Sequence, residues 1–275
     1  MKIEELHNHL FEILCTIDDI CKKENVRWFL DSGTEIGAVR DGDFIPWDDD
    51  ADTKVLAEDY PAFKAAMEKH LPPYMHLVEP WDFAPAFYDL VFHIYDDRYA
   101  IREPRGEDAW YHGWLRYVCV DVFIFTKAPA SKWSQKWMIF RNKLLYGLAM
   151  NDRYRISWRK FTGPEKLQVA CARAAGRALK INAEQICRRW WDSVNRYTHR
   201  DCSFRFAGNY KPRSLRFFPE DIYGSTAYVP IRGRLFPVPG GYDRELRLQY
   251  GDYMTPVQDS EKYGRHLPAE QGEPH

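Results

Sequence analysis

The residues of this chain best suited to chemistry form a dense group of aspartates in its first fifth. Five acids lie within ten positions: Asp43, Asp48, Asp49, Asp50 and Asp52. Apolar residues such as Phe44, Ile45 and Val55 bracket the group and pull the carboxylates toward the body of the protein. Like charges are tolerated there only with a cation present. The segment therefore predicts a metal-binding active site.

The spacing of two of these acids suggests how they hold a cation. Residues 50–55 alternate with a period of two, so Asp50 and Asp52 are expected on one face of a strand, about 7 Å apart along it. A divalent cation between the carboxylate tips would bridge them. Asp49 points the other way and is expected to be structural or solvent-facing.

A further acid stands alone in a second strand. Residues 115–125 are rich in β-branched and aromatic side chains, and Asp121 is their only acid. A charge in a central strand is costly unless it is paired or binds metal. We interpret Asp121 as a third site acid; the alternative is a structural ion pair with an arginine such as Arg40 or Arg116. Cys119 is expected to pack beside it.

Other sites of comparable chemistry fit less well. A calcium loop starting at Asp48 would need glycine at its sixth position and glutamate at its twelfth, but the chain has Thr53 and Asp59. No GxSxG, HExxH, Walker or Rossmann pattern occurs. The isolated His93 and His112 are predicted to be packed or surface residues. The six cysteines show no metal-binding spacing and favour a reducing compartment.

The elements that position these residues follow from periodicity. A helix is predicted over residues 3–24, a strand over 27–31 and a short helix over 34–40. Gly33 lies between the last two, where backbone N–H groups can face an anion, although a tight turn alone would also use glycine. The other expected elements are a helix over 58–70, paired strands over 87–95 and 98–102, helices over 132–150, 163–179 and 182–199, an extended segment over 233–238 and a helix over 241–250.

Composition and charge limit the classes of function. The chain has 275 residues with a net charge of −1, which argues against a nucleic-acid binder. Residues 132–200 hold sixteen Lys or Arg against four acids, a local balance of +12 that a solvated surface or contact with anionic lipid would explain. No apolar run approaches the roughly 20 residues of a spanning helix. The acidic, helical N-terminal segment does not read as a signal peptide, so we expect a soluble, cytoplasmic protein.

Three segments together resemble a known family. FLDSGTEIGAVRDGDFIPWDDDADT, VDVFIF around Asp121 and the later FPVPGGYDRELRLQYGDYMTP are similar to the motifs of the LicD family, which includes fukutin-related proteins. The resemblance touches residues 28–55, 115–125 and 235–256. Its first motif is long and specific.

The resemblance implies a fold and an activity. The fold would be α/β (α+β) and nucleotidyltransferase-like, with a mixed central sheet and a basic helical insertion. Family members transfer a phosphorylated headgroup from a CDP-linked donor to a glycan hydroxyl and release CMP; phosphocholine is the commonest bacterial cargo. Together with the periodicity and charge of the chain, this predicts a catalytic core with an N-terminal helix over 1–130, a basic helical region over 131–200, a C-terminal part packing on the core over 201–260 and a flexible tail over 261–275.

The resemblance also assigns roles, residue by residue. Asp50, Asp52 and Asp121 would be catalytic and would bind Mg²⁺ or Mn²⁺, with Asp121 also a candidate general base. The donor would be held by Gly33, Thr34, Arg40, Asp48, Asp31 and Trp47. The chain departs from the family in reading TKV after Asp52. Lys54 would therefore either approach the metals and contact phosphate or point away at a strand edge.

The function that we predict is metal-dependent transfer of phosphocholine from CDP-choline to a hydroxyl of a cell-surface glycan. The acceptor could be lipid-linked, with the enzyme in peripheral contact with the inner face of an anionic membrane. Three alternatives stay open: transfer of 2-aminoethylphosphonate or an alditol phosphate by the same site, nucleotidyl transfer with release of pyrophosphate, and a non-catalytic metal- or glycan-binding module.

Overall fold

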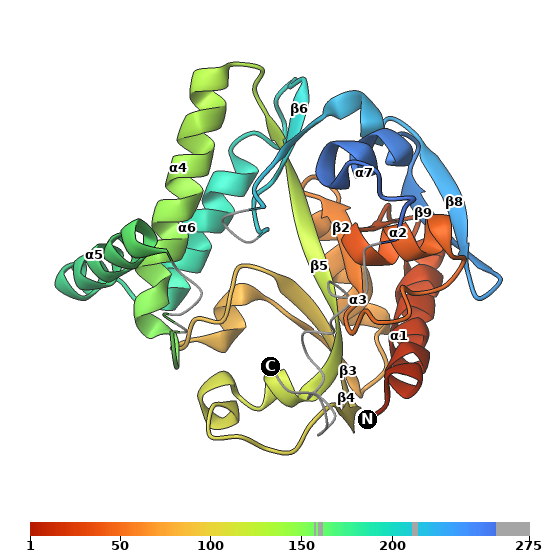
Figure 1. The fold of residues 1–275 in the computed structure, drawn as a ribbon, viewed down its shortest axis with the longest axis horizontal. Helices are drawn as coiled ribbons and strands as arrows, with labels where there is room; N and C mark the ends of the chain where they lie inside the picture. The colour runs from red at the N-terminus through yellow and green to blue at the C-terminus, as the bar shows by residue number, and fades with distance from the viewer. Residues whose placement is uncertain (157, 159–161, 211–213, 257–275) are drawn as a thin grey trace.

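A curled mixed sheet of seven strands forms the centre of the molecule (Figure 1). The computed structural model describes residues 1–156, 158, 162–210 and 214–256. Five strands follow the order β1-β2-β5-β4-β3, and β6 and β7 extend the sheet from the far end of β5. The expected mixed central sheet is confirmed. The tail predicted over 261–275 lies outside the described residues.

The long strand β5 (Tyr117–Ala128) is the axis of this sheet. It pairs in parallel with β2 (Asp52–Leu56) and antiparallel with β4 (Phe92–Ala100) and β6 (Phe204–Ala207). The remaining strands of the sheet are β1 (Phe29–Leu30), β3 (Met75–Val78) and β7 (Phe217–Pro219).

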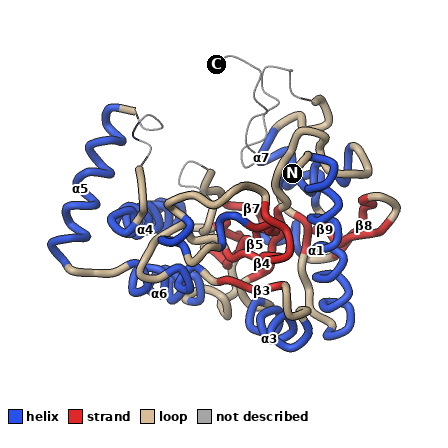
Figure 2. The backbone as a smooth tube through the Cα atoms, turned by 90° about the horizontal axis from the view of Figure 1, so that it is seen from below, coloured by secondary structure: helices blue, strands red, loops and turns tan. Residues whose placement is uncertain are grey.

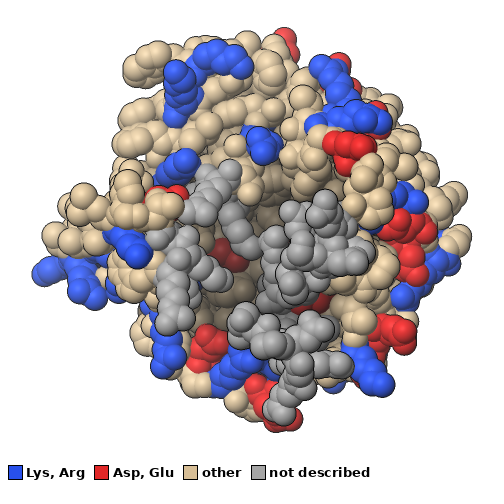
Figure 3. All heavy atoms as spheres, viewed as in Figure 1, with Lys and Arg blue, Asp and Glu red and all other residues tan. Residues whose placement is uncertain are grey.

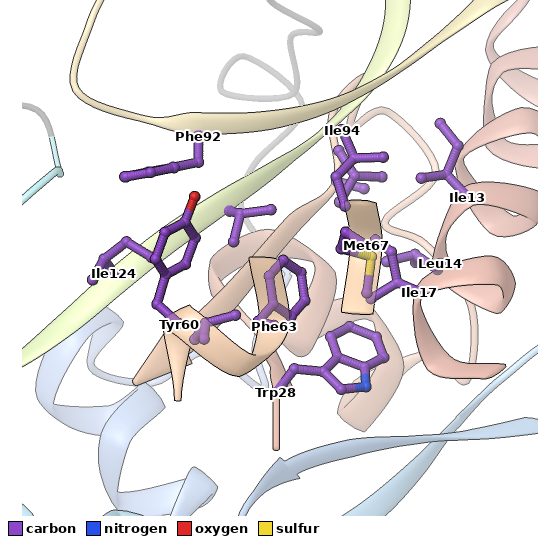
Figure 4. Packing of buried hydrophobic residues seen from close by; sticks show 14 of the residues in the cluster. Ile13, Leu14, Ile17, Trp28, Tyr60, Phe63, Met67, Phe92, Ile94 and Ile124 are labelled. Atoms are coloured by element: carbon purple, nitrogen blue, oxygen red, sulfur yellow. The ribbon is translucent and has the colours of Figure 1, made fainter. Parts of the chain in front are cut away.

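The two faces of the sheet differ in chemistry. Along β5, Val118, Val120, Val122 and Ile124 are buried, while the residues between them are half-buried on the other face. The valine face packs against α1 (Ile3–Glu24) and α3 (Tyr60–His70). Figure 4 shows the α1 side chains on the side of Ile94, and Tyr60 of α3 beside Phe92 and Ile124. Burial of each such side chain stabilises the fold by about 1.5–3 kcal/mol. The other face of β5 carries Cys119 and Asp121.

The helix α2 (Ser32–Arg40) follows β1 directly and packs closely on the acidic segment. A Cβ on Gly37 would lie 2.5 Å from the carbonyl oxygen of Asp43 and 2.8 Å from the amide nitrogen of Ile45. Glycine at this position therefore lets the helix set the path of the chain that leads to the aspartates.

Three predictions about the strands were wrong. Residues 87–102 do not form two paired strands, because β4 runs unbroken through Asp96 and Asp97; Asp96 is buried in an ion pair with Arg98 at 2.6 Å. The strand expected over 27–31 is reduced to two residues. Asp50 precedes β2 instead of lying within it. Asp49 is buried, which leaves the structural one of its two expected roles.

The three helices predicted in the basic region are confirmed as α4 (Lys132–Ala149), α5 (Gly163–Leu179) and α6 (Ala183–Asn195). They lie at the side of the sheet away from α1 (Figure 2). Small residues let α4 and α5 approach closely: a Cβ on Gly147 would lie 3.1 Å from the Cβ of Ala172. Within the described part of the chain, none of the helices has the length and apolarity needed to cross a bilayer.

The extended segment predicted over 233–238 and the helix predicted over 241–250 are confirmed as β9 (Arg234–Pro239) and α7 (Tyr242–Tyr250). A hairpin of β8 (Thr226–Ile231) and β9 turns at Arg232 and Gly233, both with positive φ as a tight hairpin requires, and α7 follows. Short 3₁₀ helices complete the chain: η1 (Pro80–Phe83), η2 (Asp108–Tyr111), η3 (Trp114–Arg116), η4 (Met150–Asp152) and η6 (Glu220–Tyr223). Because β6 pairs with β5, residues after 200 contribute to the same sheet as the first 130. The four-part division itself stays a prediction.

Candidate active site

Three chemically active side chains lie in a row across neighbouring strands. Asp52 on β2 is the register partner of Asp121 on β5, and Asp121 is in turn the partner of His93 on β4. Directly paired residues project to the same face of a sheet. All three side chains therefore lie on the sheet face opposite the valine face. The valine face is covered by α1 and α3, so a site is expected on the other one.

The start of α2 holds the acidic segment against this row. The Asp52 amide donates to Thr34 Oγ1 at 2.8 Å. A Cβ on Gly33 would lie 2.3 Å from Asp48 Oδ2, so the Asp48 carboxylate rests against the glycine backbone. The structure thus brings Gly33, Thr34, Asp48 and Asp52 together at the N-terminal end of one helix.

Asp52 is the electrostatic centre of the group. Burial raises its pKa well above the usual value, and the negative charges of Asp50 and Asp121 raise it further, with smaller contributions from Asp31 and Asp48. Carboxylates crowded in this way repel one another, and a hard divalent cation with oxygen ligands relieves the repulsion. The donor set of Asp50, Asp52 and Asp121 fits Mg²⁺ or Mn²⁺ by its chemistry.

Sequence reasoning missed the partner of Asp121. His93 is 2% exposed, and its Nδ1 lies 2.8 Å from Asp121 Oδ1, while its Nε2 lies 3.4 Å from Asp89 Oδ1. Burial opposes protonation, but Asp121 and the hydrogen bonds to both carboxylates raise the His93 pKa well above its usual value. His93 is packed, as one of its two predicted placements had it, but its partner was not predicted: Asp121 pairs with this histidine instead of an arginine. Only the register of β4 on β5 reveals the pair.

Cys119 packs beside Asp121 as predicted, with Sγ 3.9 Å from Oδ1. Ligand atoms of His93, Cys119 and Asp121 lie within 4.8 Å of one another, which is close enough to share a metal ion. Burial raises the Cys119 pKa to about 11. The cation set of Asp50, Asp52 and Asp121 stays a prediction.

Lys54 takes neither of its two expected positions. It is fully buried, with Nζ 3.1 Å from Asp31, 2.9 Å from Glu35 and 2.8 Å from Glu245. Asp31 also accepts a hydrogen bond of 2.7 Å from the Tyr210 hydroxyl. Lys54 follows Asp52 by two residues on the same strand face, so this buried group lies next to the row of Asp52 and Asp121, which we call the aspartate row. The predicted donor contact of Asp31 stays a prediction.

Two further predicted donor contacts lie at the edge of the site. Arg40 is engaged by its neighbour Asp41 at 2.7 Å and by the carbonyl oxygen of Tyr253 at 3.4 Å. Trp47 is half-buried in the acidic segment. Their roles toward a donor stay predictions.

Arg153 is a positively charged residue near His93 that the sequence did not single out. Its Nη1 lies 3.4 Å from the Tyr146 hydroxyl, and its guanidinium stacks 5.8 Å from the centre of the Tyr88 ring. Burial lowers the Arg153 pKa, but Tyr146 and the charge of Asp89 raise it more. Arg153 thus lies on the side of His93 that faces Asp89, and nothing in its sequence context sets it apart from the other bases of its segment.

Comparison with known proteins adds a family and three relatives. The family model described as LicD/FKTN/FKRP, nucleotidyltransferase domain, matches residues 25–163, a span that holds Asp52, His93, Asp121 and Arg153. The lipopolysaccharide cholinephosphotransferase LicD of Haemophilus influenzae is 22% identical over 256 residues, which cover 90% of this chain and 89% of the relative.

Two uncharacterized rickettsial proteins match over shorter spans. The protein from Rickettsia prowazekii is 25% identical over 53% of this chain and 40% of its own length. The protein from Rickettsia typhi is 27% identical over 43% of this chain and 29% of its own length.

Proposed function

The chain belongs to the LicD/FKTN/FKRP family, and on that premise we propose that it is a phosphotransferase that moves phosphocholine from CDP-choline to a hydroxyl of a cell-surface glycan and releases CMP. The observation that carries the proposal is the placement of Asp52 and Asp121 at paired positions of two parallel strands, where Asp50 adds to the charge around Asp52. The acceptor class is proposed from the Haemophilus influenzae relative, whose name gives lipopolysaccharide as its substrate.

The aspartates of the site would bind the cation that this reaction uses. Asp50, Asp52 and Asp121 would hold Mg²⁺ or Mn²⁺, with Asp48 in support. When bound, the cation neutralises phosphate oxygens and stabilises charge on the attacking and leaving groups. Asp121 would accept the proton of the acceptor hydroxyl, and His93 Nδ1, which lies 2.8 Å from it, would keep its carboxylate in orientation.

Other residues would hold the donor. Gly33 and Thr34 lie in the first turn of α2, and their backbone N–H groups would meet phosphate there. Arg153 would pair with donor phosphate, since its hydrogen bonds in the described residues are to the neutral Tyr146 and Met150. Arg40 would have to share its guanidinium with Asp41. Trp47 would contact the base or the choline ammonium. Asp31 is 1% exposed and engaged by Lys54 and Tyr210, so it would support the site from within the protein instead of contacting the donor.

The donor is tested first by thermal unfolding of the purified protein with Mg²⁺ or Mn²⁺. A ligand that binds only the folded state raises the melting temperature. A metal-dependent rise with CDP-choline is expected; a rise with CDP-ribitol or CMP-aminoethylphosphonate alone would move the proposal to an alditol phosphate or a phosphonate. Preference for CTP would favour nucleotidyl transfer, and the absence of any shift would favour a binding module.

Turnover is tested by product analysis with lipopolysaccharide as acceptor. CMP is expected, whereas pyrophosphate from CTP would identify nucleotidyl transfer. Asp52→Asn and Asp121→Asn should each abolish CMP release while the protein stays folded. Asp97→Asn is the matched control, because this β4 aspartate is 42% exposed and pairs only with His76 among the described residues. Activity of Asp52→Asn close to that of the control would refute the site.

A further inference from the structure

The outward face of α4 has an unusual composition for a surface helix. Four large apolar side chains on it are exposed: Trp133 (79%), Trp137 (51%), Phe140 (55%) and Leu144 (43%). Their spacing of three or four residues places them in one stripe along the helix. Trp137 and Phe140 lie with ring centres 5.5 Å apart, so the stripe is continuous. Exposed contiguous apolar surface of this kind marks an interaction site.

The inner side of α4 shows that the stripe is not a misplaced core. Gln135 and Asn142 face inward at 5% exposure, where they donate hydrogen bonds to the carbonyl oxygens of Pro129 and Gly208. Met138 completes the contact. Leu148 and Ala149 at the end of the helix are buried in the core as well. The inner side of α4 is therefore already packed and hydrogen-bonded, and the four apolar side chains of the stripe are additional to it.

The charges on α4 indicate what covers the stripe. Lys132, Lys136 and Lys143 are exposed among the apolar side chains, and the helix holds no Asp or Glu. Figure 3 shows basic side chains over the beginning of α4, at the upper left. Aromatic rings settle at the boundary of headgroups and acyl chains, and lysines extend their ammonium groups to anionic headgroups.

We propose that the outward face of α4 binds the surface of an anionic lipid bilayer, with the stripe from Trp133 to Leu144 in the interface and the three lysines on lipid phosphates. A second copy of the same face is a poorer partner, because the lysines of the two faces would oppose one another. Binding itself does not depend on the proposed reaction. Its purpose does: an acceptor carried on a lipid would be held near the transferase.

The test is flotation of the full-length protein with vesicles of phosphatidylcholine, with and without phosphatidylglycerol. The protein should float with the anionic vesicles at low salt and remain in solution with phosphatidylcholine alone. Each lysine near such a surface is worth about a fivefold factor in partitioning, so replacing Lys132, Lys136 and Lys143 with Gln should lower the partition coefficient roughly a hundredfold. Trp133→Gln with Trp137→Gln should remove flotation at any salt concentration.

The control is the pair Tyr228→Gln and Leu235→Gln, which removes comparable exposed apolar surface, 57% and 53%, from the β8–β9 hairpin. This variant should float like the wild type. Failure of the wild type to float with anionic vesicles, or equal flotation of the tryptophan variant, would overturn the proposal. The melting-temperature shift with CDP-choline is measured on the same variants; its retention without flotation separates membrane binding from donor binding.

Discussion

The buried cation beneath the aspartate row should be essential to folding, and replacement of Lys54 by methionine tests this. Lys54 Nζ contacts Asp31, Glu35 and Glu245 at 2.8–3.1 Å, and all four side chains are at most 1% exposed. Methionine keeps most of the buried stem but removes the charge. Three carboxyl groups then face one another without a cation in a region that water does not reach.

The expected cost follows from that geometry. A contact at 4 Å is worth about 4 kcal/mol at an effective dielectric constant of 20, before the cost of removing the charges from water. Breaking a buried ion pair by deleting one partner costs about 3–5 kcal/mol net. We therefore expect Lys54→Met to lose about 3–5 kcal/mol of unfolding free energy, a large share of the total for a domain of this kind.

Urea unfolding measures this loss, with Lys64→Met as the matched control. Lys64 also makes an ion pair, 2.6 Å from Glu79, but it is 36% exposed. Glu79 keeps hydrogen bonds from Tyr60 and Trp81 when the lysine is removed. The control should therefore cost no more than about 1 kcal/mol.

A second substitution shows whether charge is the cause. Glu245→Gln removes one negative charge from the group, so adding it to Lys54→Met should recover part of the lost stability. The same change alone should destabilise the wild type. A Lys54→Met protein as stable as the Lys64→Met control, or a double variant less stable than the single one, would refute the account of the buried group.

Three further predictions use other parts of the site. Burial raises the Glu35 pKa well above 4.5, so stability should fall as pH rises from 4.5 toward the raised folded-state pKa. Glu35→Gln removes the effect, so its stability relative to wild type should increase as pH rises above 4.5 in urea unfolding. A difference that does not change with pH would contradict the raised pKa. Gly37→Ala should cost about 1–3 kcal/mol or more of unfolding free energy, because its Cβ would meet backbone atoms of Asp43 and Ile45. In Gly33→Ala the new Cβ meets only the side-chain carboxylate of Asp48, so this variant should lose CMP release more than stability. Equal melting temperatures of the two variants would contradict the difference. Arg153→Gln should raise the KM for CDP-choline more than Arg40→Gln does, since Asp41 already engages Arg40, and the reverse order would return the phosphate contact to Arg40.

Periodicity in the sequence predicted the elements that bury one clear face. The helices α1 and α6 and the strand β5 each repeat apolar residues at the spacing of their secondary structure. The error in β4 has a local cause. Asp96 and Asp97 resemble a turn, but the Arg98 guanidinium pairs with the buried Asp96, and the strand continues. An ion pair that neutralises a buried charge leaves no mark in the hydrophobic pattern.

The sequence pointed to the candidate acids of the site but not to the partners that they and Lys54 contact. Asp48 to Asp52 are neighbours, and Asp121 stood out as a lone acid in an apolar strand. The contacts of Asp121 with His93, and of Lys54 with Glu245, join residues 28 and 191 positions apart. Such pairs depend on strand register and on the docking of α7, neither of which one sequence determines.

The partners of the buried Lys54 explain how one sheet face holds several carboxylates without the lysine neutralising Asp52 and Asp121. Lys54 lies two residues after Asp52 on the same face, but its ammonium is engaged by Asp31, Glu35 and Glu245. It therefore anchors β2 to α2 and α7 without neutralising the row above it. Asp52 accordingly keeps a raised pKa under the charges of Asp50 and Asp121, which is the condition that a bound divalent cation relieves. Had Lys54 pointed at Asp52 and Asp121, its ammonium would have competed with the metal for those oxygens, so the departure from the family pattern after Asp52 is compatible with a metal site at the row.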